Sequence, residues 1–186
     1  MIGLLTTSVL SQAAPAVWNT SYIAQGVRPG AKVGLELALA ESETSRSRRG
    51  EERTTTRTLL IEPALQGWYH WGNHTPLTAG GQLIYRRTSH RGWSREALVG
   101  QGATYAINAG LTYSLDDSGE LTSSRLAGQL MSATSLGFGI GRDTDGAAAL
   151  AWHLRPTLTI WAPYTSGIAP VFTIEIGIRR TWGEGQ

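Results

Sequence analysis

Two adjacent residues offer the clearest candidates for catalysis in this sequence. Ser89 and His90 lie in a polar segment, and a serine activated by a histidine is the nucleophile and base of many hydrolases, including those that act on lipids. Neighbouring residues of an extended chain point in opposite directions, however, and catalytic triads depend on geometry rather than on sequence adjacency. The sequence therefore assigns no catalytic residue.

Metal and cofactor chemistry finds no better support. His70, His74 and His153 follow no zinc-binding spacing, and the chain has no cysteine. A second candidate is a set of alternating glycines that lacks the dinucleotide-binding pattern, which needs three glycines between a strand and a helix. On a strand, such glycines are expected to leave room for a large side chain of a neighbour. They are Gly137, Gly139 and Gly141. We predict neither a metal nor a cofactor.

Charged residues are the remaining candidates. Lys32, Glu36, Glu62 and Arg86 each occupy the face of an alternating segment that lies opposite its large apolar residues. If these segments are strands of one sheet, the four charges share a face, and buried charges must be paired. We expect ion pairs that fill an interior, with a gate or an ion path as the alternative. Gln66 follows Glu62 on the same face but stands about 13 Å farther along the strand, as does His70 beyond Gln66.

Period-two alternation identifies the elements that would position these charges. Val33, Leu35 and Leu37 alternate with small or charged residues, and the same pattern recurs along the chain. We find no convincing helical periodicity, so the prediction is an all-β fold of long antiparallel strands. Seven segments alternate in this way: 31–41, 59–71, 77–87, 97–115, 121–141, 147–162 and 169–182.

The connections between these segments fall into two groups. Polar stretches at 42–57, 88–96 and 141–147 are expected to be loops, and the first is much the longest. Compact turn sequences follow the other strand ends. These are 72–76, 116–119 and 163–168.

Composition restricts the class of protein. The 186 residues suffice for one domain, and only 16% are charged against roughly 25% in soluble domains. The net charge of +2 does not indicate a nucleic-acid partner. No run reaches the roughly 18 apolar residues of a membrane helix. A chain of this kind would have to cross a membrane as a closed sheet, because lipid cannot satisfy the backbone groups of an open edge.

Aromatic residues lie where such a sheet would meet the membrane boundary. They stand at strand ends beside short turns or near the terminus, and we interpret them as one half of an aromatic girdle. They are Trp68, Trp71, Trp161, Tyr164 and Trp182.

Alternating strands, aromatic belts and a last strand ending FTIEIGIRRTW resemble bacterial outer-membrane β-barrel proteins, whose final strand typically ends in an aromatic residue that the assembly machinery recognises. The resemblance covers 31–182 and concerns architecture rather than one family. It departs from the pattern in that Gly183–Gln186 follow Trp182. It implies an antiparallel up-and-down transmembrane-type β-barrel of about eight strands in a bacterial outer membrane.

An even strand number requires an eighth strand. The segment 17–28 could provide it, which would place the 42–57 loop and the chain termini on the same side; another polypeptide could close the barrel instead. We expect a signal remnant or ordinary N-terminal segment at 1–16, the barrel at 17–182 and a tail at 183–186.

The expected function is structural, assembly or docking work in the cell envelope. The expected partners are outer-membrane lipid, lipopolysaccharide and other envelope proteins, and no nucleic acid. The arginine-rich stretches near 46–57 and 86–95 would be solvated or would contact anionic headgroups. The alternatives are a barrel enzyme acting on lipid A or phospholipid, and a soluble β-sandwich protein of a virion or filament.

Overall fold

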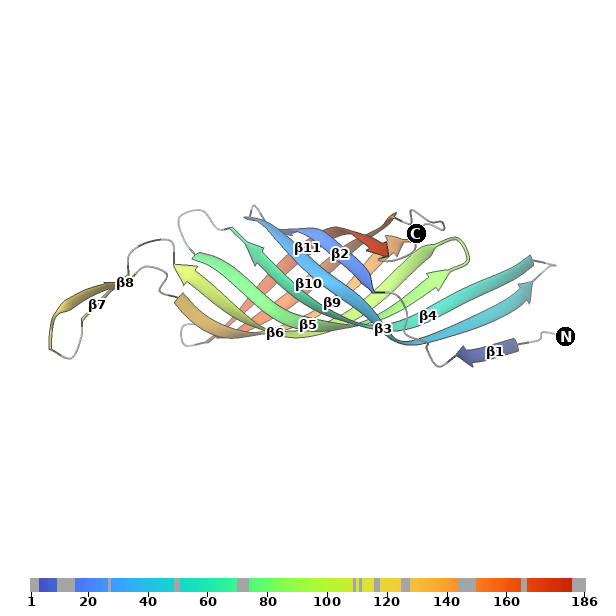
Figure 1. Cartoon of the computed structure of the whole chain (residues 1–186), viewed down its shortest axis with the longest axis horizontal. Coiled ribbons are helices and arrows are strands. Elements are labelled where there is room, and N and C mark those ends of the chain that lie inside the picture. Colours follow the sequence, from blue (N-terminus) through green and yellow to red (C-terminus); the bar gives the residue numbers. More distant parts are fainter. Residues whose placement is uncertain are drawn as a thin grey trace.

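The computed structural model describes residues 4–9, 16–26, 28–48, 51–69, 74–108, 110, 112–115, 118–124, 128–143, 150–164 and 167–181. The elements within these residues are strands (Figure 1). They are β1 (Leu4–Val9), β2 (Val17–Gln25), β3 (Arg28–Arg48), β4 (Glu51–Trp68), β5 (His74–Ser89), β6 (Trp93–Asn108), β7 (Thr112–Leu115), β8 (Leu121–Ser124), β9 (Gly128–Arg142), β10 (Leu150–Tyr164) and β11 (Gly167–Thr181). In this part of the chain, no helix is long and apolar enough to cross a membrane.

Eight of these strands close into a ring. The order is β3-β2-β11-β10-β9-β6-β5-β4, and a further pairing of β3 with β4 joins the two ends. Every neighbouring pair is antiparallel. The predictions of an all-β fold and of an antiparallel barrel of about eight strands are confirmed.

The eighth strand is β2, as the sequence suggested. It pairs with β11 from Val17–Thr181 to Ala24–Ile174, and with β3 along its whole length. The described strands therefore close the barrel without a second polypeptide. The chain enters β2 and leaves β11 at the same end of the barrel, which we call the terminal end; we call the other the hairpin end.

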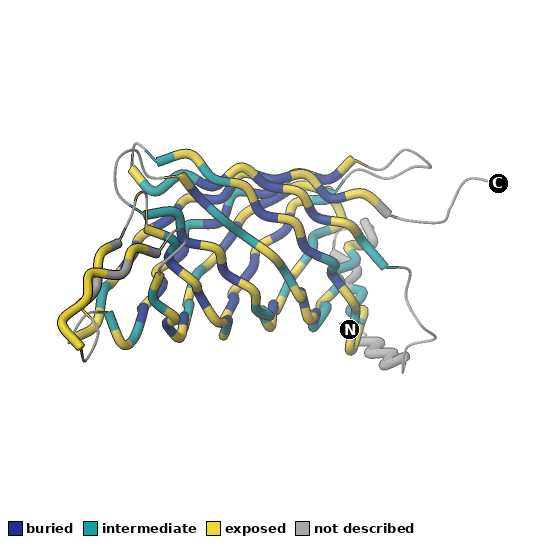
Figure 2. Tube along the Cα trace, turned by 60° about the vertical axis from the view of Figure 1, so that its left-hand side comes forward, coloured by how far each residue is buried: buried dark blue, intermediate teal, exposed yellow. Residues whose placement is uncertain are grey.

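The two faces of the sheet are inverted relative to those of a water-soluble protein. Leu83, Val99 and Leu136 point outward and are 42%, 49% and 66% exposed, whereas Glu62 and Arg155 point inward and are fully buried. Figure 2 shows the alternation of buried and exposed positions along the barrel strands. The large apolar side chains thus cover the outside, and the charges fill the inside.

The predicted loop at 42–57 is wrong. These residues continue β3 and β4 as a paired ribbon, from Ser42–Arg57 to Arg48–Glu51, which projects beyond the barrel at the terminal end (Figure 1). β1 adds to its β3 edge. Both faces of the ribbon are polar, so no apolar alternation marks it. Its β-branched threonines still favour strand pairing, and the Ser45 and Thr54 hydroxyls lie 3.2 Å apart across it.

Two predicted strands are each divided. The segment 97–115 separates into β6 and β7, and 121–141 separates into β8 and β9. β7 and β8 pair only with each other and form a hairpin that projects from the hairpin end (Figure 1). The alternation continues unbroken into this hairpin, because a two-stranded ribbon has the same period as a barrel strand.

The predicted aromatic girdle is also partly wrong. Trp68 and Trp161 are only 3% exposed and stack inside the barrel with ring centroids 5.7 Å apart, and Tyr164 packs against them. Every second residue of a strand faces the same side, and Trp68 and Trp161 share this parity with the inward-facing residues of their strands. Parity therefore decides their orientation, although they lie near strand ends. Trp71 and Trp182 lie outside the described residues.

Other aromatic side chains do face outward near both ends. At the terminal end, Trp93 meets Trp152 edge to face at 5.9 Å, and Trp18 lies nearby along the ring. At the hairpin end, Tyr69 and Tyr105 are exposed. The outer surface therefore has aromatic residues at the two boundaries of its apolar band, the arrangement typical of membrane-spanning barrels.

Candidate functional site in the barrel lumen

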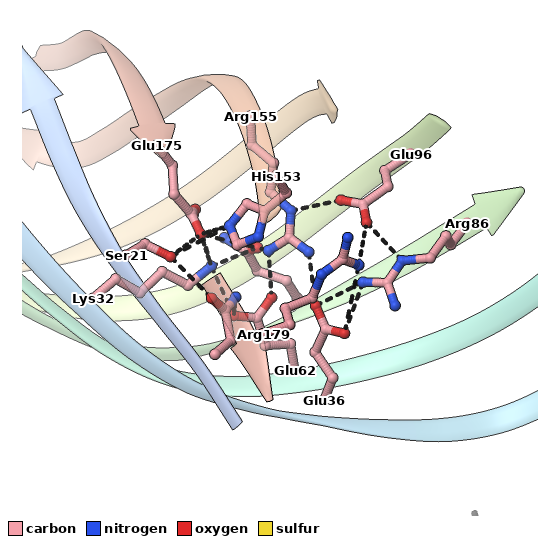
Figure 3. A network of polar contacts seen from close by, with 12 residues as sticks. Ser21, Lys32, Glu36, Glu62, Arg86, Glu96, His153, Arg155, Glu175 and Arg179 are labelled. Carbon is pink, nitrogen blue, oxygen red and sulfur yellow. Dashed lines mark hydrogen bonds and ion pairs between the residues drawn. The ribbon is translucent and has the colours of Figure 1, made fainter. Parts of the chain in front are cut away.

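Charged side chains from six strands meet in the barrel interior and form the lumen network (Figure 3). Four are basic and four are acidic. All but Arg86, whose side chain is 11% exposed, are at most 6% exposed. The members are Lys32, Glu36, Glu62, Arg86, Glu96, Arg155, Glu175 and Arg179.

Arg155 is the centre of this network. Its Nε donates to Glu96 at 2.6 Å, its Nη1 to Glu62 at 2.9 Å, and its Nη2 to Glu36 at 2.8 Å. Glu175 lies 3.5 Å from Nη1. The planar guanidinium presents its donors in a fixed fork, so one side chain can orient several carboxylates at once. Arg155 thereby connects β10 to β3, β4, β6 and β11.

The other cations complete the neutralisation. Arg86 bonds Glu36 at 2.7 Å and Glu96 at 2.6 Å. On the opposite side of Arg155, Lys32 lies 2.9 Å from Glu62 and 3.1 Å from Glu175. Because these basic and acidic groups balance, the network needs no additional ion for electroneutrality.

Arg179 extends the network toward the terminal end. Its Nη1 bonds Glu96 at 3.0 Å, and its Nη2 lies 3.1 Å from Asp143, which is partly exposed. Charged pairing thus continues from the middle of the lumen to its rim.

A serine, a histidine and a glutamate also meet here. Ser21 Oγ lies 3.3 Å from His153 Nε2, and Glu175 Oε1 lies 2.9 Å from the same nitrogen. A hydrolytic triad needs the acid on one ring nitrogen and the serine on the other. His153 Nδ1 has no partner within the described structure, and Ser21 donates directly to Glu175 at 2.8 Å. The group is therefore a buried hydrogen-bond cluster, and its geometry does not fit a triad.

Interior glycines create the space that the network occupies. A Cβ built on Gly139 would lie 2.9 Å from Arg155 Cγ, and one built on Gly141 would lie 2.9 Å from Arg179 Nη2. A Cβ on Gly177 would meet both Ser21 and the His153 ring. The prediction that alternating glycines make room for large neighbouring side chains is confirmed for Gly139 and Gly141.

We expect Gly177→Ala to destabilise the barrel by about 1–3 kcal/mol, the usual cost of overpacking. The added methyl group would displace His153 or Ser21 from Glu175. The matched control is Gly81→Ala, because a Cβ there has no neighbour closer than 4.0 Å. Urea unfolding of both variants in the same lipid provides the comparison. Equal stabilities would show that the lumen is not packed as described.

Beyond the network, the lumen remains filled toward the hairpin end. A small polar hollow of about 30 Å³ is lined by residues that include Gln66, Thr78 and Ser135. Past it, the Trp68–Trp161 stack packs with Met131 and Val171. At these two levels, side chains of the described residues fill most of the lumen.

The structure brings together the four charges singled out in the sequence. Lys32, Glu36, Glu62 and Arg86 all belong to the lumen network. The other members were not predicted, although their odd or even position along each alternating strand could have identified them. Glu175 and Arg179, for example, share the face opposite the Ile and Phe positions of their strand. The remaining missed members are Glu96 and Arg155, with His153 beside them.

The other candidates do not converge. Ser89 ends β5 and His90 lies in the following turn, whereas His74 is at the opposite end of the barrel and His153 is in the lumen. His70 lies outside the described residues. Among the described residues, no group of His, Asp and Glu has the arrangement of a metal site.

Comparisons of the chain with protein-family models, with curated proteins and with solved structures found no match. Any functional assignment therefore depends on the geometry of this molecule.

Proposed function

We propose that the protein is an integral β-barrel of a bacterial outer membrane with a structural, assembly or docking role and a closed lumen. The observation that carries this proposal is the inverted sheet, in which apolar side chains cover the outside and paired charges fill the inside. In water this arrangement would leave many large apolar side chains solvated, whereas in a bilayer it buries them in lipid.

The height of the apolar surface supports a membrane location. Along β11, the outward positions from Ile168 to Ile178 are all apolar, and Arg180 follows. Ten residues span about 33 Å along a strand. With the tilt of roughly 40° that is usual for such barrels, this gives about 25 Å of height, which matches the apolar band of transmembrane barrels.

Polar residues bound this band at the terminal end. Outward arginines stand there on five of the eight barrel strands, as expected for side chains that reach lipid headgroups. They are Arg57, Arg87, Arg95, Arg142 and Arg180. Within the band, a polar cluster interrupts the surface, in which Gln101 bonds the Ser132 and Thr134 hydroxyls at 2.7 Å. Its mutual hydrogen bonds reduce the cost of contact with lipid.

The filled lumen favours a structural role over transport. Eight-stranded barrels have interiors that side chains fill, and here ion pairs and the tryptophan stack do so. The β3–β4 ribbon and the β7–β8 hairpin project beyond opposite ends and offer surfaces for docking (Figure 1). Leu115 and Leu121 on the hairpin are 70% and 67% exposed.

The alternatives receive less support. A lipid-modifying enzyme would need an accessible nucleophile beside a base, and Ser21 is buried in a cluster without triad geometry. A β-sandwich would consist of two separate packed sheets, whereas these strands close into one ring.

The experiment is refolding of the full chain from denaturant with and without lipid vesicles. We expect the folded barrel only with vesicles or detergent, seen as β-sheet circular dichroism and as altered gel migration before boiling. A monodisperse folded protein in detergent-free buffer would contradict the proposal.

A further inference from the structure

We propose that a hollow on the outer surface of the terminal end binds the phosphate group of an anionic membrane lipid. The site lies across β4, β5, β6 and β9, and its charged members are Arg87 and Arg95. This inference rests on the proposed membrane location and assigns a ligand to one part of the outer surface.

The first observation is an arrangement of like charges. Arg57 pairs in register with Arg87, and Arg87 pairs with Arg95, so three outward arginines are direct neighbours across three strands. Like charges at directly opposed strand positions are destabilising. Within the described residues, none of the three forms an ion pair with a carboxylate. The arrangement therefore calls for an external anion.

The second observation is the hollow itself. It has a volume of about 470 Å³ and is lined by Thr55, Arg87, Ser89, Trp93, Ser94, Arg95 and Ile140. All but Ser94 have the outward parity of their strands. Thr55 and Ser89 are partners in the β4–β5 register, so two residues with hydroxyl groups line the hollow together with the two arginines. Guanidinium and hydroxyl donors in this combination suit phosphate oxygens.

The position of the hollow favours a lipid over a free ion. Ile140 lines it, and the outward residues that continue toward the hairpin end are apolar, among them Phe138, Val99 and Leu136. A headgroup phosphate could bind the arginines while its acyl chains follow this apolar surface. Ser89, considered above as a nucleophile, would here be a hydrogen-bond donor.

Charge selects the type of headgroup. A phosphomonoester carries about −1.5 to −2 at neutral pH, which can neutralise two arginines, whereas a phosphodiester carries one negative charge. A lipid that ends in a phosphomonoester should therefore bind more tightly than phosphatidylglycerol. Zwitterionic phosphatidylcholine should bind least.

The test is thermal unfolding of the full chain in neutral detergent, titrated with phosphatidic acid, phosphatidylglycerol or phosphatidylcholine. We expect phosphatidic acid to raise the Tm of the wild type most. In Arg87→Gln/Arg95→Gln, its apparent Kd should weaken by about tenfold or more, since two charge-assisted contacts are lost. The matched control, Arg180→Gln, removes an outward arginine at the same end but outside the hollow and should retain the wild-type Kd.

The site would be refuted if the double variant bound phosphatidic acid as the wild type does, or if the three lipids were equivalent. In a second titration, inorganic phosphate replaces the lipid. If it raised the Tm as much as phosphatidic acid does at the same concentration, the assignment of a lipid as the ligand would be overturned. Without added lipid, the double variant should be at least as stable as the wild type, because the repulsion is removed. Since vesicle insertion is measured separately, failure of this site is distinguishable from failure of the membrane proposal.

Discussion

Replacing Arg155 with methionine should destabilise the barrel by about 3–5 kcal/mol or more, the cost of removing one partner from a buried ion pair. Methionine fills much of the same volume, so the loss is mainly electrostatic. Glu36, Glu62 and Glu96 would each lose a contact shorter than 3 Å in a lumen from which water is largely excluded. Since whole domains are stable by only about 5–15 kcal/mol, the variant should fold poorly.

Urea unfolding in vesicles measures this effect. Arg180→Met is the control, because Arg180 points outward two residues from the apolar band and contributes nothing to the lumen network. Adding Glu96→Gln to Arg155→Met should restore part of the stability, since it brings the network back to three basic and three acidic groups. Equal stabilities of the Arg155→Met and Arg180→Met variants would show that the network does not hold the strands together.

Much of the barrel was predictable from alternation, since one face of every barrel strand must be apolar. The same signal failed where both faces have similar polarity. The 42–57 ribbon is polar on both sides, so its pairing leaves no period in the sequence. The β7–β8 hairpin alternates as the barrel does, so its separation from β6 and β9 depends on pairing partners that a single sequence does not encode locally.

The interior was predictable in type but not in detail. Parity placed Lys32, Glu36, Glu62 and Arg86 inside, but which cation contacts which carboxylate depends on the shear of the closed ring. Trp68 and Trp161 were misplaced for a different reason: their position near a strand end was given more weight than their parity. The alternation also places Gly34 inside but does not show how tightly it is packed: a Cβ there would lie 2.5 Å from Glu62 Oε1.

The central claim is that the outer face contacts lipid. Its most direct test is how the loss of stability caused by one added charge varies with the depth of that charge in the bilayer. Leu136 and Leu39 both point outward and are 66% and 51% exposed, but Leu136 lies within the apolar band and Leu39 two residues from Glu41 at the rim. Arginine costs about 2–4 kcal/mol at the bilayer midplane and about 0–1 kcal/mol near the interface. Unfolding of Leu136→Arg and Leu39→Arg from vesicles should therefore show a loss of about 2–4 kcal/mol for the first and little for the second. Small and equal losses at both positions, as expected for leucines that face water, would contradict the account.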